Sequence, residues 1–189
     1  MGAGGLWLCL MRQRWRFFGL IPVLLGMLYP LYTMQPDFMV TADGKEWSAR
    51  LEDGKLAAST LRHDKFTFEQ WQERLGNPDL VDAHDLLPEE ETQLRYDDAG
   101  CVYRKDGHVL AVPTVDAAAL DDCEQADIIV APFLIRDCAA KTIIDDPQFW
   151  HHGAHAIYFR QDGSMRVEYA RERRGMKLWS VGWKTNSTI

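Results

Sequence analysis

The sequence predicts an α/β protein in which a membrane helix precedes a mixed sheet with flanking helices. Two observations lead to this prediction. Residues 17–33 contain no charged side chain and follow three arginines. From Asp37 onward, four Asp-Gly pairs separate segments of β-type composition, and helical patterns lie between them. An uncharged run of this length approaches the roughly 20 residues of a spanning helix, and Asp-Gly is typical of tight hairpin turns.

The apolar run FFGLIPVLLGMLYPLYT, residues 17–33, is interrupted by Pro22 and Pro30. Membrane helices tolerate proline when neighbouring helices or water molecules satisfy the freed carbonyl groups. We therefore expect this helix to have membrane-helix neighbours. Arg12, Arg14 and Arg16 indicate a cytoplasmic end before the run. This orientation predicts an inner-membrane protein whose C-terminal domain lies on the extracytoplasmic side.

Two alternatives remain open for the N-terminal region. A basic stretch before an apolar run also fits a cleaved signal peptide, but no small-residue cleavage site follows Tyr32, so an anchor is favoured. Residues 2–10, GAGGLWLCL, resemble the end of another membrane helix, unless Met11 is the true start. The predicted organisation is a membrane region at 1–36 with a short cytoplasmic arginine-rich loop, an extracytoplasmic α/β domain at 37–175, and a loose tail at 176–189.

The region after residue 36 is distinctly acidic. It carries 18 basic and 28 acidic side chains, a net formal charge of −10. An acidic surface repels phosphate groups and does not by itself attract nucleic acid. The simplest interpretation of this charge is solubility.

Four hairpins follow from the Asp-Gly pairs. Residues 37–41 are predicted to pair with 46–51, which then turn into 55–61; 101–105 pair with 108–112, and 155–160 with 165–170. The run DIIVA, residues 127–131, is typical of a central strand buried on both faces. Residues 142–144 predict another short core strand.

Three helices are predicted between these strands. Thr67 and Gln70 form a capping box for a helix that ends at Gly76. Asp116 caps a helix extending to Ala126, with Ala119, Leu120 and Cys123 on its inward face. Pro147 follows two aspartates and opens a short helix that ends at His151 or His152. Residues 78–92 are expected to form a polar connector with one helical turn.

Three cysteines fall in the exported part, where disulfides are expected. These candidates are Cys101, Cys123 and Cys138, so one of the three must remain free or pair with another chain. Cys123 ends a predicted helix before the central strand and Cys138 is predicted to begin the next strand, so both should lie at one edge. We therefore favour the pair Cys123–Cys138.

No motif indicates catalysis. The chain contains no H-E-x-x-H, no G-x-S-x-G and no glycine-rich phosphate loop. His151, His152 and His155 form the only histidine cluster, but Gly153 interrupts the helix that would align them, and polar surface is the favoured interpretation. Arg171, Arg173 and Arg174 are candidates for contact with DNA or lipid phosphates, although a solvated charged segment is the simpler interpretation. No catalytic residue, metal ligand or cofactor is predicted.

Several segments resemble the C-terminal end of ComEC-type competence proteins. They are residues 14–57, AGCVYRKDGHVLAV, ALDDCEQADIIVAPF, WHHGAHAIYF and RVEYARERRG. This family consists of polytopic inner-membrane proteins associated with the passage of single-stranded DNA during transformation. Its C-terminal domain is often metallo-β-lactamase-like, an αββα sandwich. The resemblance therefore implies a degenerate fold of this type.

Active members of that family carry H-x-H-x-D-H after an early strand and further histidines after a strand like DIIVA. This sequence lacks H-x-H-x-D-H and has Ala131-Pro132-Phe133 at the second place. The resemblance thus implies a catalytically silent domain, acting as a scaffold or DNA guide, with the membrane, other channel helices and single-stranded DNA as partners. The family's channel core is missing, so we expect a fragment or a shorter relative. Alternatives are a metal-dependent nuclease using residues 151–155 and an anchored domain with an unrelated interaction role.

Overall fold

The computed structural model describes residues 6, 9–10, 14–28, 34–62, 64–86, 93–160 and 162–175. The chain divides into two units, Met1–Gln35 and Pro36–Ile189. The predicted loose tail at 176–189 and the end of the predicted membrane run at 29–33 lie outside the described residues.

The first unit contains a 3₁₀ helix, η1 (Arg14–Gly19), followed by the short helix α2 (Leu20–Leu28). Apolar side chains such as Leu24, Leu25 and Met27 are exposed in it. Within the described part of the chain, no helix combines the length and apolar character that crossing a membrane requires. The prediction of a membrane helix at residues 17–33 is therefore not supported by the helices described.

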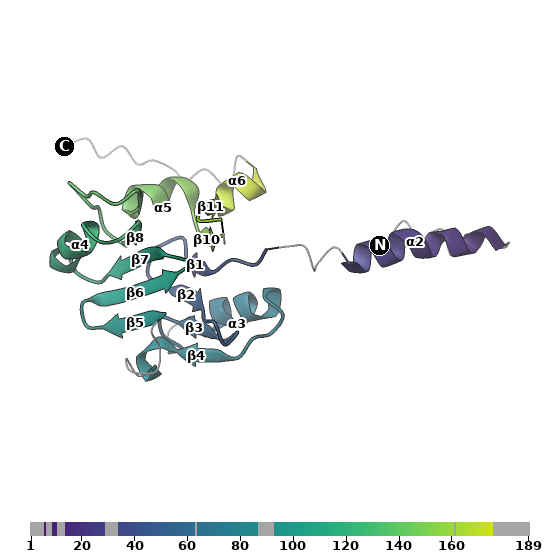
Figure 1. Cartoon of the computed structure of the whole chain (residues 1–189), viewed down its shortest axis with the longest axis horizontal. Coiled ribbons are helices and arrows are strands. Elements are labelled where there is room, and N and C mark those ends of the chain that lie inside the picture. The colour runs from purple at the N-terminus through teal and green to yellow at the C-terminus, as the bar shows by residue number, and fades with distance from the viewer. Residues whose placement is uncertain are drawn as a thin grey trace. The chain divides into compact units, whose positions relative to one another are not determined.

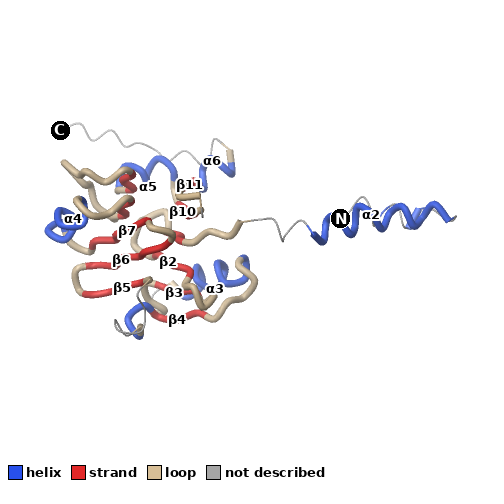
Figure 2. The backbone as a smooth tube through the Cα atoms, in the orientation of Figure 1, coloured by secondary structure: helices blue, strands red, loops and turns tan. Residues whose placement is uncertain are grey.

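The second unit begins with a six-stranded mixed sheet, which we call sheet A (Figures 1 and 2). Its strands are β1 (Phe38–Val40), β2 (Trp47–Arg50), β3 (Leu56–Ala58), β4 (Leu80–Asp82), β10 (His155–Phe159) and β11 (Met165–Tyr169). They lie in the order β11-β10-β1-β2-β3-β4, and only β3 and β4 are parallel. The hairpins predicted around Gly44, Gly54 and Gly163 are confirmed, and all three glycines have positive φ.

The second sheet, sheet B, has five strands in sequence order. They are β5 (Leu94–Asp97), β6 (Gly100–Lys105), β7 (His108–Pro113), β8 (Ile128–Val130) and β9 (Thr142–Ile144). The first three are antiparallel and the last three parallel. Asp106 and Gly107 both have positive φ, 50° and 79°, as a two-residue type I′ turn requires. Strand β8 is buried along its whole length, as the DIIVA run predicts.

The two sheets share one apolar core. Phe38 and Trp47 of sheet A and Tyr103 of sheet B belong to it, and the Phe38 ring lies 5.6 Å from Trp47 and 5.9 Å from Tyr103. The Tyr103 hydroxyl donates a 2.7 Å hydrogen bond to the Arg50 carbonyl of β2. The inner faces of the sheets are therefore joined by packing and by a directional polar contact.

Four helices accompany the two sheets: α3 (Lys65–Arg74), α4 (Asp116–Cys123), α5 (Asp146–His152) and α6 (Ala170–Arg174). Helices α3 and α4 lie on the outer sides of sheet A and sheet B, whereas Phe149 of α5 packs into the core between the sheets and α6 follows β11. Because strand side chains alternate, Ile128 and Val130 face the core between the sheets, while Ile129 faces outward and packs with Ala119 and Cys123 of α4. Helix α3, with the buried Phe68, lies beside β3 and β4 of sheet A (Figure 1).

The structure differs from the prediction within residues 78–92. This segment contains β4 and the 3₁₀ helix η3 (Ala83–Asp85), while residues 87–92 lie outside the described part. Strand β4 has only three half-buried residues, too few to show a period of two. The hairpin pattern predicted one sheet, whereas the structure has two sheets, the number that an αββα sandwich contains. Strand β5 was missed.

Two helices also differ from the prediction in their ends or faces. Helix α3 begins at Lys65, because the Asp64 carboxylate accepts hydrogen bonds from the backbone N–H and the hydroxyl of Thr67; Asp64, not Thr67, is the cap. Helix α4 ends at Cys123 rather than Ala126. The prediction that Leu120 faces inward is wrong, since its side chain is 62% exposed.

Asp37 connects both sheets at the start of the domain. Its carboxylate lies 2.5 Å from Lys105 Nζ of β6 and accepts a 2.8 Å hydrogen bond from the Phe159 N–H of β10. Its backbone bonds to Ile157 and Arg50 in the two flanking strands. The Asp37 side chain is only 9% exposed, so this is a largely buried ion pair.

We predict that Lys105→Met lowers the free energy of unfolding by about 3 kcal/mol, because it leaves the Asp37 charge buried without its partner. The matched control is Lys55→Met, which removes the exposed Asp53–Lys55 pair and should cost less than about 1 kcal/mol. Urea denaturation of both variants measures the difference. Equal costs for the two substitutions would contradict the structural role assigned to Asp37.

Candidate functional site

A cleft of about 720 Å³ opens where several strand ends of both sheets meet. It is lined by the β1–β2 turn, the segments that follow β3, β4, β7 and β8, and parts of β5 and β6. The lining residues are Gly44, Lys45, Glu46, Trp47, Ser59, Thr60, Leu61, Arg62, Asp82, His84, Asp85, Tyr96, Gly100, Val112, Pro113, Thr114 and Pro132. The carboxyl ends of two parallel pairs, β3 with β4 and β7 with β8, contribute to it.

Most polar groups of this cleft are engaged with the protein itself. The Ser59 hydroxyl bonds to the Glu46 carboxylate and accepts a 3.2 Å hydrogen bond from the Trp47 N–H. The Asp82 carboxylate accepts hydrogen bonds of 3.0 Å from the N–H groups of Leu61 and His84. Asp82 thus ties the loop after β3 to the end of β4. The Glu46 carboxylate thus holds the Ser59 hydroxyl, and the Asp82 carboxylate holds two backbone N–H groups.

An aromatic pair occupies one wall of the cleft. The His84 ring lies edge-on to Tyr96 with centroids 4.4 Å apart, and Trp47 lies 6.3 Å from Tyr96. Burial, reinforced by the neighbouring Cys101 and Asp82, raises the pKa of Tyr96 above that of a free phenol. Tyr96 therefore keeps its proton at neutral pH and offers a hydroxyl and a ring face, not a phenolate.

No metal-binding arrangement is found in the described part of the chain. Among those residues no three His, Cys, Asp or Glu side chains are placed to hold one ion. His63, in the loop after β3, lies outside the described residues. The cleft lining carries acidic and basic side chains together, among them Glu46, Asp82, Lys45 and Arg62.

The predicted histidine cluster does not line the cleft, and His151 and His155 differ in burial. Helix α5 ends at His152, and Gly153 has φ of 74°, so His151 and His155 do not share a helix face. His151 is exposed, whereas His155 starts β10 and is 2% exposed. The interpretation of this cluster as polar surface is wrong for His155, because the alternation of β10 turns it toward the core with Ile157.

His155 is a buried titratable group. The rings of Phe149 and Tyr169 stand nearly perpendicular to it at 5.1 and 5.0 Å. The backbone of Gly153 partly offsets the effect of burial on the pKa of His155. Within the described part of the chain, no group forms a hydrogen bond of normal geometry with either ring nitrogen. Burial lowers the pKa of His155 to about 4. The ring is therefore neutral at physiological pH.

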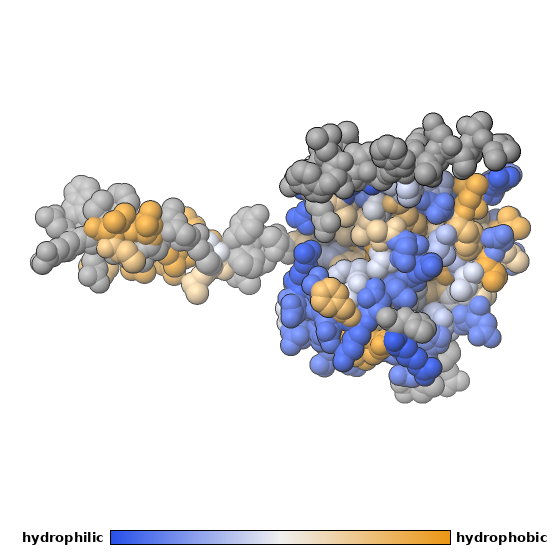
Figure 3. Space-filling model, turned by 180° about the vertical axis from the view of Figure 1, so that it is seen from behind, coloured by the Kyte–Doolittle hydropathy of each residue, from blue (hydrophilic) through white to orange (hydrophobic). Residues whose placement is uncertain are grey.

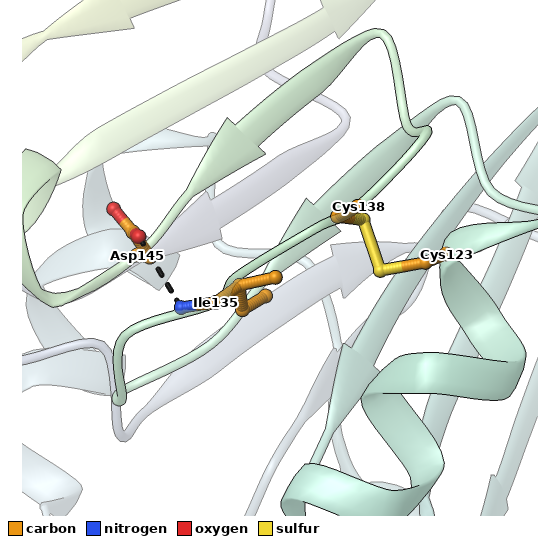
Figure 4. The surroundings of a disulfide bond; sticks show 4 residues. All are labelled: Cys123, Ile135, Cys138 and Asp145. Carbon is orange, nitrogen blue, oxygen red and sulfur yellow. Dashed lines mark hydrogen bonds between the residues drawn. A yellow bond between two sulfur atoms is a disulfide. The ribbon is translucent and has the colours of Figure 1, made fainter.

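The structure joins Cys123 and Cys138 by a disulfide (Figure 4). Cys123 is the last residue of α4, and Cys138 lies in the segment between β8 and β9. Nearby, the Ile135 N–H donates a 3.4 Å hydrogen bond to Asp145, which anchors the same segment at a second point. The other candidate, Cys101, is a free, buried thiol whose pKa is raised well above its usual value by burial.

The predicted phosphate-binding arginines lie in α6 and have different partners. Arg171 donates a hydrogen bond to the His151 carbonyl at 2.5 Å. Arg173 lies 3.7 Å from Glu168, which also pairs with Arg166 at 2.9 Å. The side chain of Arg174 lies outside the described residues. Arg171 thus links α6 to α5, whereas the Arg173 side chain is 76% exposed and makes only a surface ion pair with β11. Neither residue lines the cleft.

Sequence reasoning missed the cleft itself. Its polar members, such as Glu46, Asp82 and His84, follow no known motif. The order of elements could have indicated the cleft. A strand, a helix and a second short strand between Leu56 and Asp82 predict a parallel pair of strands. The loops that follow the two strands then lie at the same edge of the sheet. The two residues Leu80-Val81 gave too weak a strand signal for that step.

Comparison with known proteins returned no relative for this chain. No protein-family model matches it, no curated protein is similar to it at a significant level, and no solved structure matches it.

We predict that the double substitution Cys123→Ser/Cys138→Ser lowers the free energy of unfolding by about 3 kcal/mol, the value expected for a loop of this length. The loop between the two cysteines spans 15 positions. Denaturation with and without a reductant measures the effect. The reductant should destabilise the wild-type chain and leave the double variant unchanged; a wild-type protein whose stability survives verified reduction would contradict the prediction.

We predict that His155 makes the stability depend on pH. The unfolded chain protonates this ring below about pH 6.5, whereas the native ring stays neutral down to about pH 4. The free energy of unfolding therefore falls by up to about 3 kcal/mol as the pH decreases through this window. Below about pH 4 the contribution of His155 no longer changes with pH.

The test compares wild type with His155→Leu, which fills similar space without titrating. Denaturation between pH 7.5 and 4 should show the variant gaining stability relative to wild type as the pH falls. Because both proteins contain the same carboxylates, the pH dependence that these groups cause cancels in the difference. A constant difference across this range would contradict the prediction, because it would mean that His155 takes up its proton at the same pH in the native and the unfolded chain.

Proposed function

We propose that residues 37–175 form a degenerate, catalytically silent metallo-β-lactamase-like domain of a ComEC-type DNA-uptake protein. Its role is that of an extracytoplasmic scaffold for the membrane part of the uptake machinery. The proposal combines the sequence resemblance with the layer order of the domain. Two mixed sheets face each other, with helices on their outer faces, which is compatible with an αββα sandwich.

The observation that carries this proposal is the composition of the cleft. In active relatives, the resemblance implies metal-binding histidines after an early strand and after the strand equivalent to β8. Here the segments after β3 and after β8 line one cleft, with Ser59–Arg62 on one side and Pro132 on the other. We take β3 as the counterpart of that early strand. The described residues at the two positions then contribute hydroxyl groups, Arg62 and proline, which supports a catalytically silent domain.

A scaffold is favoured over a DNA guide on electrostatic grounds. The region after residue 36 has a net formal charge of −10, which repels phosphate groups. Within the cleft, Glu46, Asp82 and Asp85 outnumber Lys45 and Arg62. Of the other candidates for phosphate contact, Arg171 donates a hydrogen bond to the His151 carbonyl, and Arg173 lies beside the Glu168 carboxylate, which lowers the local positive charge.

One observation favours DNA guidance as a second candidate. Lys45 and Arg62 line the same cleft as the ring pair of His84 and Tyr96. Basic groups beside aromatic faces are the combination with which proteins hold single-stranded DNA. This role requires that Lys45 and Arg62 make the electrostatic potential of the cleft positive despite its three acidic residues.

The disulfide supports the proposed compartment. Disulfides persist outside the cytoplasm and are rare within it. The bond between Cys123 and Cys138 thus fits a domain on the extracytoplasmic side of the inner membrane. Arg12, Arg14 and Arg16, on the opposite side of the apolar run, fit the same orientation.

The proposal is tested in the source organism by deleting the gene and measuring uptake of transforming DNA. The scaffold role predicts that uptake is lost, and that both the wild type and Lys45→Glu/Arg62→Glu restore it. Restoration by the wild type alone, together with single-stranded DNA binding that this variant abolishes, would establish the guide role instead. Unchanged uptake in the deletion strain would overturn the proposal.

The purified full chain in detergent provides the matching binding assay. A scaffold should bind a fluorescent single-stranded oligonucleotide no more tightly than about 100 μM even at low salt, the weak end of non-specific binding. A different outcome would support the metal-dependent nuclease instead of the scaffold. The purified protein would then retain stoichiometric zinc or manganese and show nuclease activity that a chelator removes.

A further inference from the structure

Strand β11 forms one outer edge of sheet A. It pairs with β10 on one side, and within the described residues no strand lies on its other side. Edge strands present unpaired backbone N–H and C=O groups, on which a further strand can pair. With five residues, Met165–Tyr169, β11 is longer than the other described edge strands β4, β5 and β9, which have three, four and three residues. Strand β11 therefore offers the longest edge for pairing.

The hydrogen bonds between β10 and β11 show which backbone groups of β11 are left for another strand. The Ala170 N–H donates to the Ala154 carbonyl at 2.8 Å, and the Arg160 N–H donates to the Ser164 carbonyl at 2.9 Å. Bonded and non-bonded positions alternate along an antiparallel pair, so the even-numbered residues of β11 bond to β10. The backbone groups that point away from β10 belong to Met165, Val167 and Tyr169.

The order of side chains on β11 is self-complementary. In an antiparallel pairing of two copies centred on Val167, Arg166 lies opposite Glu168 of the other copy. The same pairing places Met165 opposite Tyr169. A shift by two residues would place either Arg166 or Glu168 opposite itself, and like charges directly opposite each other destabilise a strand pair. The charges therefore select both the partner, a second copy of β11, and the register.

We propose that two copies of the chain associate through β11 in this register, so that sheet A continues from one copy into the other about a two-fold axis. The Val167 N–H donates to the Val167 carbonyl of the other copy, and the Tyr169 N–H donates to the Met165 carbonyl. The Tyr169 carbonyl is left to α6, of which Tyr169 is the N-cap. These groups point away from β10, so the hydrogen bonds within sheet A stay intact. The inference goes beyond the proposed scaffold role and does not depend on it.

The charged groups on β11 already form a cluster within one chain. Arg166 Nη2 lies 2.9 Å from Glu168 Oε1, and Arg173 lies 3.7 Å from the other oxygen of this carboxylate. The Arg166 side chain is 58% exposed, so a second copy can reach it. In the pair, each Glu168 lies between its own Arg166 and the Arg166 of the other copy. The contact thus forms a network of alternating charges, which stabilises more than an isolated surface pair.

Apolar surface does not direct this contact. Figure 3 shows apolar atoms gathered on the side of the domain where α4 lies, to the right in that view. Pairing through a strand edge instead derives its affinity from main-chain hydrogen bonds and its specificity from alternate side chains. The contact therefore needs a free edge and matched charges, and β11 provides both.

Disulfide formation between two chains tests the register. In the full chain in detergent, Cys9, an exposed free cysteine, is replaced by serine. One chain then carries Arg166→Cys, and a second chain with an affinity tag carries Glu168→Cys. These positions form a non-hydrogen-bonded pair whose Cα atoms lie about 4.5 Å apart, within the range of a disulfide. We expect a covalent dimer from the mixture on a non-reducing gel.

The matched controls are the two cysteine variants taken singly. In the proposed register, position 166 of one copy lies diagonal to position 166 of the other, about 7 to 8 Å away, and the same holds for position 168. Each variant alone should therefore give little covalent dimer. Equal yields from the mixture and from the single variants would overturn the register.

Charge reversal tests the ion pairs by sedimentation equilibrium of the full chain in detergent. Arg166→Glu and Glu168→Arg each place like charges opposite one another, and each should raise the dissociation constant of the dimer about tenfold. An equimolar mixture of the two variants restores opposite charges across the contact, so it should associate about as tightly as wild type. Each chain in the mixture keeps its own like-charged pair, so this recovery cannot come from repair within one chain.

Three results would overturn the proposal. The wild-type chain could remain monomeric, or the mixture could associate no better than its components. Alternatively, the dimer could survive both charge reversals, which is the result expected if the chains associate through the exposed apolar side chains of α2 instead.

Discussion

The ion pair between Asp37 and Lys105 is the interaction on which the arrangement of the two sheets depends. Asp37 stands where the chain enters the second unit, and its backbone fixes β1 between β2 and β10. Its carboxylate reaches Lys105 of the other sheet and the Phe159 N–H of its own. Removing a carboxylate from water is costly unless charged and hydrogen-bonding partners surround it. The sheets must therefore approach in the one arrangement that brings these groups together.

Features that depend on neighbouring residues could be predicted from the sequence. Asp-Gly pairs fixed the turns before Lys45, Lys55, His108 and Ser164, because glycine adopts positive φ without a steric penalty. The run DIIVA predicted a strand buried on both faces. The disulfide partners followed from the order of a helix and a strand. Each of these inferences needed only residues close together in the chain.

Features that depend on distant contacts could not be predicted. Sheet A depends on the pairing of β1 with β10, two strands far apart in the sequence, which no local pattern encodes. The cleft draws its lining from seven stretches of chain, so Glu46, Asp82 and His84 carry no joint signal. His155 lies inside a polar-looking cluster, and only the alternation of β10 shows that it is buried. Leu120 looked like a core residue because composition alone does not reveal which face of α4 meets the sheet.

The three cysteines of the domain lie in different environments, and this difference affects which disulfide forms. Cys101 sits in the core between the sheets as a free thiol with a raised pKa, while Cys123 and Cys138 lie on the outer side of sheet B. Exchange requires an accessible thiolate. Burial between the two sheets therefore keeps the free thiol of this domain, Cys101, from exchanging with the bond between Cys123 and Cys138 once the domain has folded.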